Sequence, residues 1–217
     1  MQVTVFGAGG RTGQWVVDYA LQAGHLVRAF VLTPQDCRQL GAHNLEVITG
    51  DVLDPARVAD ALVSADAVVS VLGVADYLNP GTFLEDAMGV ITSEMARHDV
   101  DRIVALAGGG ILDAPDGGLR VDMPGFPPEF VPMTLAHKGT WDALARSESA
   151  WTLACAPAFG PGPRGKGAVV SAPDVEPPGI VPGLTAGDIA WWMLEELGDR
   201  RYLRTRVGIG LQAVDPA

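Results

Sequence analysis

The sequence predicts an α/β chain organised around a doubly wound parallel sheet. Short apolar runs alternate with segments whose apolar residues recur at helical spacing, and the run at 67–72 is almost entirely apolar. A strand that helices cover on both faces has this composition, whereas a half-exposed strand alternates apolar and polar residues. Strand–helix–strand repeats of this length form right-handed crossovers and make successive strands parallel. We expect residues 1–217 to form one domain.

The predicted elements follow one another in a regular order. The first strand, residues 3–6, leads into a glycine-rich turn, and the helical pattern at 15–21 then ends at Gly24, a common helix terminator. Further strands are expected at 25–31, 45–48, 67–72, 102–107 and 151–156, and further helices at 55–63, 82–98 and about 134–147.

Two segments interrupt this order. Residues 108–133 and 157–183 are rich in glycine and proline, and each follows the carboxyl end of a predicted strand. Open α/β sheets bind their ligands at that edge, and long loops in a compact chain are usually functional. We therefore expect these two loops to form the walls of a substrate pocket. The alternative is that they are simple surface excursions.

Composition and charge exclude several classes of protein. Fifteen basic and 26 acidic residues give a net charge of −11, which argues against a nucleic-acid partner. No apolar run reaches the ~18 residues of a membrane span, and the N-terminus does not resemble a secretion signal. The two cysteines, Cys37 and Cys155, lack metal-ligand spacing. We expect a cytoplasmic protein with reduced thiols and no metal site.

Glycines follow the first predicted strand at a spacing that suits phosphate binding. Gly7, Gly10 and Gly13 form G-x-x-G-x-x-G between a strand and a helix. Such glycines allow a sharp turn, the approach of a pyrophosphate and close helix–strand packing, while the helix N-terminus offers free N–H groups. Gly9 adds a G-x-G pair, but Thr12 stands where the usual dehydrogenase motif has its last glycine. The alternative is a structural turn that binds no ligand.

Two other strand ends are candidates for the nucleoside. Asp51 follows the third strand, where it could accept a hydrogen bond from an adenine amino group while Val52 covers the ring. The alternative for Asp51 is to cap the next helix, a task that Asp54 could equally perform. Leu72 and Gly73 close the fourth strand and are expected beside the adenine ribose.

These motifs together resemble the atypical short-chain dehydrogenase/reductases. The similar segments are residues 7–13, 50–54, 71–73 and 136–138, together with 184–190, which opens a late helix. Over roughly residues 1–195, the sequence is most similar to proteins like biliverdin reductase B and to the NmrA-like group. The resemblance implies a Rossmann fold, a nicotinamide dinucleotide and reduction of flavins, quinones or other conjugated compounds.

The choice between NADP and NAD depends on the end of the second strand. An acidic residue that binds the NAD ribose is expected there, but Leu32, Thr33 and Pro34 include no carboxylate. NADP requires a cation near its 2′-phosphate. Arg11 is the best candidate, with help from Arg38 or a hydrogen bond from Thr33. We therefore expect NADP, with NAD as the alternative and a solvated loop charge as the alternative role of Arg11.

The residues that typical short-chain reductases use for proton transfer are missing. The resemblance implies a Tyr four residues before Lys138, where Thr134 stands, and a Ser at Gly108. Pro157 follows the sixth strand, where relatives present a polar group. Lys138 is expected to hold the nicotinamide ribose and His137 to face the pocket, although each could instead be an exposed helix residue.

A reduction that needs little acid assistance is compatible with these residues. We expect an NAD(P)H-dependent transfer of hydride to a small conjugated acceptor such as a flavin or quinone. The alternative is a non-catalytic dinucleotide sensor of the NmrA-like type. The chain is expected to be a monomer or a homodimer.

Overall fold

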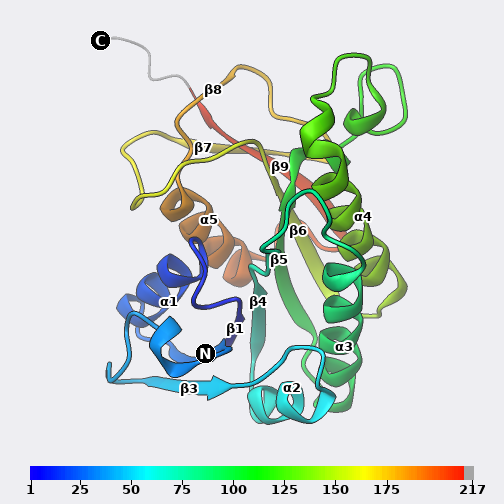
Figure 1. The fold of residues 1–217 in the computed structure, drawn as a ribbon. Coiled ribbons are helices and arrows are strands. Elements are labelled where there is room, and N and C mark those ends of the chain that lie inside the picture. Colours follow the sequence, from blue (N-terminus) through cyan, green and yellow to red (C-terminus); the bar gives the residue numbers. More distant parts are fainter. Residues whose placement is uncertain (213–217) are drawn as a thin grey trace.

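The computed structural model describes residues 1–212, which form a single sheet with helices on both faces (Figure 1). Over these residues the sheet has nine strands in the order β3-β2-β1-β4-β5-β6-β9-β7, with β8 beside β9. The pairs from β3 through β6 to β9 are all parallel, and β7 and β8 run antiparallel to β9. The strands are Gln2–Phe6, Leu26–Val31, Leu45–Thr49, Ala67–Ser70, Arg102–Gly108, Ala150–Ala156, Val169–Pro173, Ile180–Val181 and Thr205–Gln212.

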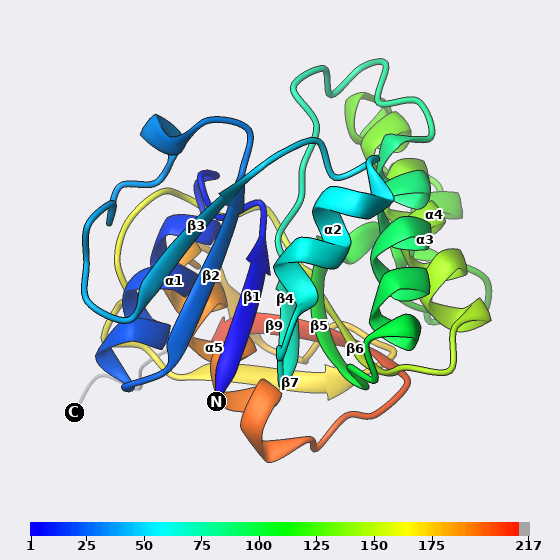
Figure 2. The ribbon, with the colours of Figure 1, turned by 90° about the horizontal axis from the view of Figure 1, so that it is seen from below.

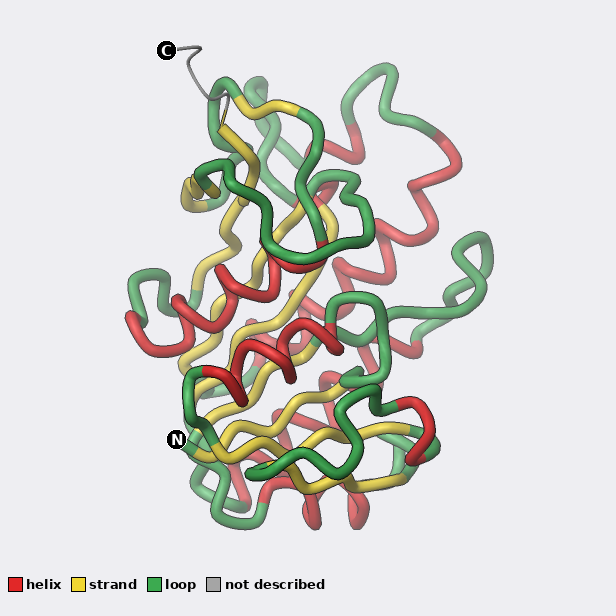
Figure 3. The backbone as a smooth tube through the Cα atoms, turned by 90° about the vertical axis from the view of Figure 1, so that its left-hand side faces the viewer, coloured by secondary structure: helices red, strands yellow, loops and turns green. Residues whose placement is uncertain are grey.

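Within the described residues, five α-helices cover the sheet in two layers. α1 and α5 lie on one face, and α2, α3 and α4 lie on the other (Figures 1 and 2). Viewed from the α1 and α5 side, the helices of this layer lie in front of the strands (Figure 3). The helices are Gly13–Gln22, Pro55–Leu62, Phe83–Arg97, Val131–Arg146 and Ala186–Asp199. None of the helices within residues 1–212 has both the length and the apolar character needed to cross a membrane.

The core is divided by the sheet because successive side chains of a strand point to opposite faces. In β1, Val3 and Val5 pack with α1 and α5, whereas Phe6 packs with α2 and α3. In β4, Val69 joins the first cluster and Val68 the second. The predicted doubly wound parallel sheet is therefore confirmed, and its apolar strands are covered on both faces.

Most predicted elements agree with the structure to within a few residues. β4 ends at Ser70, so residues 71–72 lie beyond the strand rather than within it. α4 begins at Val131, three residues before the predicted start, because Pro132 lies in the first helical turn. Proline is tolerated there, since its missing N–H would have no helical partner.

The prediction that residues 157–183 lack secondary structure is wrong. This segment contains β7 and β8, and both pair with β9, which the sequence analysis did not predict. β9 contains Gly208 and Gly210, and a Cβ on Gly208 would lie only 2.1 Å from the carbonyl oxygen of Val175. Glycines therefore permit the close approach of the chain here, and they also remove the apolar run that identifies a strand.

Candidate functional site

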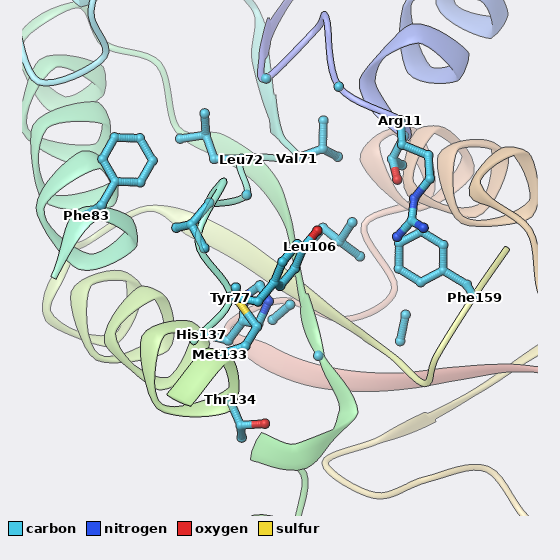
Figure 4. Close-up of a pocket in the computed structure, with 18 of the residues that line it drawn as sticks. Arg11, Val71, Leu72, Tyr77, Phe83, Leu106, Met133, Thr134, His137 and Phe159 are labelled. Carbon is cyan, nitrogen blue, oxygen red and sulfur yellow. The ribbon is translucent and has the colours of Figure 1, made fainter. Parts of the chain in front are cut away.

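A cavity of about 1240 Å³ opens above the carboxyl ends of β1, β4, β5 and β6. The glycine-rich turn after β1 forms one end, and α4 with the loop after β5 forms the other. Figure 4 shows Arg11 and Phe159 at the first end and Met133, Thr134 and His137 at the second. Segments 108–133 and 157–183 both contribute residues to its lining.

The turn after β1 can be formed only by glycine at two of its positions. Gly7 has a φ of +80°, and a Cβ there would lie 2.8 Å from the carbonyl oxygen of Val71. A Cβ on Gly13 would lie 2.1 Å from the carbonyl oxygen of Gly7, so α1 packs directly against the turn. The N–H of Gly10 donates to that same carbonyl at 3.0 Å.

The N-terminus of α1 leaves hydrogen-bond donors available at the cavity. Within residues 1–212, no hydrogen bond uses the backbone N–H of Arg11, Thr12 or Gly13, and the Thr12 side chain does not cap the helix. Gly7, Gly9, Gly10, Arg11 and Thr12 line the cavity. Free N–H groups at the positive end of a helix suit an anionic group. The residues present therefore fit a pyrophosphate.

The strand ends expected to hold the nucleoside lie beside this turn. Asp51, Val52, Leu72 and Gly73 all line the cavity. Asp51 accepts a hydrogen bond from the N–H of Leu53 at 2.9 Å, which fixes the turn after β3. The N-cap of α2 is Asp54, whose carboxylate accepts from the N–H of Ala56, so Asp51 is not the cap.

Asp36 is a cavity residue that the sequence analysis did not consider. It lies in a short 3₁₀-helix after β2, and its carboxylate accepts from the backbone N–H and the hydroxyl of Thr33. A Cβ on Gly9 would lie 2.8 Å from the Cβ of Asp36, which places the acid against the glycine-rich turn. It lies four residues after Leu32, beyond the end of β2 where a ribose-binding acid is expected from the sequence.

The cations proposed for a 2′-phosphate are arranged differently from the prediction. Arg11 extends toward the loop after β6, and its guanidinium lies over the Phe159 ring, 4.2 Å from the ring centroid (Figure 4). Arg38 pairs with Asp18 and lies over Trp15, 4.6 Å from its ring centroid. Neither Arg38 nor Thr33 is among the cavity-lining residues.

The far half of the cavity is mostly apolar. Gly108 and Pro157 line it at the ends of β5 and β6. Thr134 also lines this half and is mostly buried against Gly110, where a Cβ would lie 2.7 Å from the Thr134 methyl group. The apolar side chains are Phe83, Leu106, Phe126, Phe130 and Met133.

His137 lies in this half and Lys138 does not. The Nδ1 atom of His137 is buried without a hydrogen-bond partner among residues 1–212. Burial lowers the pKa of His137 to about 4, so the ring is neutral near pH 7. Lys138 is absent from the cavity lining, and its Nζ is paired with Asp142 at 2.8 Å. The structure therefore does not bring Lys138 to the position that the sequence predicts.

Two loops join at the cavity through an ion pair. Arg120, from the loop after β5, lies 3.0 Å from the carboxylate of Glu176, from the segment after β7. Both residues line the cavity and are about one-third exposed. The pair leaves this part of the wall without net charge.

Comparisons with known proteins identify the family and the fold. The model of a family described as NAD(P)H-binding matches residues 7–200. A proposed NADH-flavin reductase from Streptococcus pneumoniae has a TM-score of 0.84 and 22% identity, covering 98% of this chain and 100% of the other. A proposed epimerase from Bacteroides thetaiotaomicron has a TM-score of 0.85 and 23% identity, covering 99% of each chain.

A short-chain dehydrogenase/reductase from Veillonella parvula, solved in complex with NADP, is also similar. It has a TM-score of 0.74 and 13% identity over 96% of this chain and 94% of the other. At these identities the three structures show a shared fold, which is the Rossmann fold that the sequence predicts.

Proposed function

The chain belongs to the NAD(P)H-binding family, and we propose that it is an NAD(P)H-dependent oxidoreductase that reduces a conjugated acceptor. One observation carries this proposal. A single cavity extends from the glycine-rich turn to the apolar half beside α4, and its volume of about 1240 Å³ accommodates a dinucleotide and a second planar molecule. When bound, the reduced nicotinamide supplies a hydride.

The residues of the first half would bind the dinucleotide. The free N–H groups of Arg11, Thr12 and Gly13 would hold the pyrophosphate, with Gly7, Gly9 and Gly10 leaving room for it. Asp51 and Val52 would contact the adenine, and Leu72 and Gly73 would lie beside its ribose. Gly108 and Pro157 would border the nicotinamide. Lys138 and Thr33 receive no role in this proposal, because neither lines the cavity.

The arrangement of charges at the end of β2 supports a different dinucleotide from the one that the sequence predicts. The sequence favours NADPH because of Arg11 and the absence of a carboxylate at the strand end. The position of Asp36 against Gly9 supports NADH instead, since a carboxylate repels a 2′-phosphate and accepts from ribose hydroxyls. Leu32 lines the cavity at the end of β2 and offers no charge to a phosphate. We therefore infer a preference for NADH.

The chemistry of the second half fits an acceptor that needs little acid assistance. Thr134, at the position of the usual catalytic tyrosine, is buried and too weakly acidic to donate a proton at neutral pH. A flavin or quinone spreads the negative charge that hydride transfer leaves on it, so water can supply the proton. The apolar lining would exclude bulk water from the nicotinamide carbon that carries the hydride.

The missing tyrosine and serine also favour a second candidate function. A chain with Thr134 and Gly108 at those positions could bind the dinucleotide and regulate a partner without catalysis. A sensor of this kind has no need for the apolar half of the cavity, which is the reason we prefer the enzyme.

Turnover measurements distinguish these two functions. We would mix the purified protein with NADH or NADPH and a panel of flavins and quinones, and follow the loss of reduced-nicotinamide absorbance. Turnover that Gly10→Asp abolishes supports the enzyme, because a carboxylate at this position repels the pyrophosphate. Gly89→Asp is the matched control, since Gly89 is exposed on α3 and a Cβ there meets nothing within 4 Å. Tight binding with no turnover on any acceptor supports the sensor.

A further inference from the structure

We propose that His137 donates a hydrogen bond from Nε2 to the carbonyl oxygen of the acceptor, which is an uncharged conjugated carbonyl compound of the quinone type. This inference rests on the proposed function and names the group that assists hydride transfer in place of the absent tyrosine and serine. It also names the substrate class.

The orientation of the His137 ring supports this role. The ring projects from α4 into the cavity, and its Cδ2 atom lies 3.5 Å from the position that a Cβ on Gly108 would occupy. Cδ2 is bonded to Nε2, so the edge that carries Nε2 lies toward the carboxyl end of β5. Nδ1, on the opposite side of the ring, is buried.

The burial of Nδ1 indicates which nitrogen carries the proton. A neutral imidazole has one N–H donor and one acceptor nitrogen. A buried N–H without a partner is rarer in proteins than a buried acceptor without one. Because Nδ1 has no partner within residues 1–212, it is the acceptor nitrogen, and Nε2 carries the hydrogen that faces the cavity.

The charges around the cavity define the acceptor. In the half beside α4, the charged lining residues Arg120 and Glu176 are paired with each other at 3.0 Å. The other lining cation among the described residues, Arg11, belongs to the glycine-rich turn and lies over Phe159. A flavin nucleotide would bring a phosphate that no free cation in this half receives. An uncharged, planar carbonyl compound fits the apolar side chains and the His137 donor.

The reaction balances with these components alone. Hydride transfer would break one C–H bond of the reduced nicotinamide and form one new bond on the acceptor, moving two electrons and leaving the dinucleotide oxidised. Negative charge accumulates on the carbonyl oxygen, and that oxygen then takes one proton from water. The hydrogen bond from His137 strengthens as this charge develops, so it lowers the barrier more than it tightens binding of the acceptor.

Kinetics of two variants test the role of His137. His137→Leu removes the donor and keeps an apolar side chain of similar size, whereas His137→Gln restores an N–H donor. We expect kcat with naphthoquinone to fall roughly 10- to 100-fold in His137→Leu and to recover largely in His137→Gln, with dinucleotide affinity unchanged in both. His98→Leu, at the end of α3 and outside the cavity lining, is the control. Equal kcat in His137→Leu and the unmodified protein overturns the proposal.

Acceptor charge is tested with a matched pair of flavins. Riboflavin and FMN share the same ring system and differ by one phosphate. We expect riboflavin and naphthoquinone to be reduced with higher kcat/KM than FMN. Reduction of FMN as efficiently as riboflavin overturns the assignment of an uncharged acceptor.

A measurement without the dinucleotide separates this inference from the proposed function. Long-range proton–nitrogen NMR correlations of the protein at neutral pH report the His137 tautomer. We expect Nε2 to carry the hydrogen and its signal to shift on addition of naphthoquinone. A hydrogen on Nδ1, or an Nε2 signal that does not respond, overturns the role of His137. Lack of turnover on every acceptor, with the NMR result as expected, overturns the proposed function and leaves the His137 contact supported.

Discussion

The guanidinium of Arg11 lies over the ring of Phe159, 4.2 Å from the ring centroid. This contact joins the turn after β1 to the loop after β6, so the arginine extends across the cavity rather than toward the end of β2. A cation–π contact of this kind contributes about 0.5–1 kcal/mol at an exposed site. Arg11 is therefore better placed to hold the two loops together than to select a 2′-phosphate.

Cofactor selectivity is expected to depend on Asp36 more than on Arg11. Asp36→Asn removes a negative charge beside Gly9. We expect it to improve the affinity for NADPH relative to NADH by roughly tenfold, because a repulsive contact of about 1.4 kcal/mol is lost. Arg11→Ala should weaken both dinucleotides to a similar extent. Calorimetric dissociation constants for both reduced dinucleotides check this. A loss specific to NADPH in Arg11→Ala would restore the role that the sequence predicts for Arg11.

Because α1 packs closely on the glycine-rich turn, we expect a methyl group at Gly13 to destabilise the folded protein strongly. We expect Gly13→Ala to lower the free energy of unfolding by about 3 kcal/mol or more, because the new Cβ would lie 2.1 Å from the Gly7 carbonyl oxygen. Gly89→Ala, in the open middle of α3, should instead be neutral or stabilise by about 0.5–1 kcal/mol. Urea unfolding of both variants gives the comparison. Equal stabilities would show that the turn can relax around the added carbon.

Because the ion pair between β5 and α5 is buried, we expect the free energy of unfolding to depend strongly on both of its partners. Arg102 and Glu196 lie 3.0 Å apart, with side chains that are 3% and 0% exposed. Burial lowers the pKa of Arg102 to about 10, so the arginine stays charged at neutral pH. Arg102→Met should cost about 3–5 kcal/mol, because it leaves Glu196 buried without this partner.

A double variant separates the ion pair from the packing around it. Arg102→Met with Glu196→Leu is expected to be more stable than Arg102→Met alone, since no buried charge is left. Arg146→Met is the surface control, because Arg146 and its partner Glu85 are 64% and 38% exposed and their pair should contribute less than about 1 kcal/mol. Thermal unfolding at neutral pH measures all three. A double variant less stable than the single one would contradict this account.

Burial of His137 predicts a loss of stability in mild acid. Its pKa falls from 6.5 to about 4 on folding, so the unfolded chain takes up the proton first as the pH is lowered. The stability present above pH 6.5 is then lost progressively down to about pH 4, by about 3 kcal/mol from this residue. Unfolding free energies measured across this range for the unmodified protein and His137→Gln give the difference. Parallel curves would show that His137 is not buried as described.

Local patterns in the sequence are sufficient to predict the glycine-rich turn and the six parallel strands from β1 to β6. Each of those features depends on residues close together in the chain, such as Gly7, Gly10 and Gly13 around the start of α1. β9 and its antiparallel partner β7 were not predicted, because their pairing joins residues far apart and Gly208 and Gly210 interrupt the apolar run of β9.

The sequence by itself determined the fold class, the glycine-rich turn after β1 and the edge of the sheet at which the cavity lies. Tertiary packing decided which side chains reach that edge. α4 packs closely on α3 at Gly139, where a Cβ would lie 2.8 Å from the Cβ of Glu85, and this contact fixes the rotation of the helix. Because successive residues of a helix differ by about 100° in direction, His137 then faces the cavity and Lys138 does not. Asp36 likewise reaches Gly9 only because the chain folds back after β2. The two residues are far apart in the sequence, so no local pattern predicts this contact.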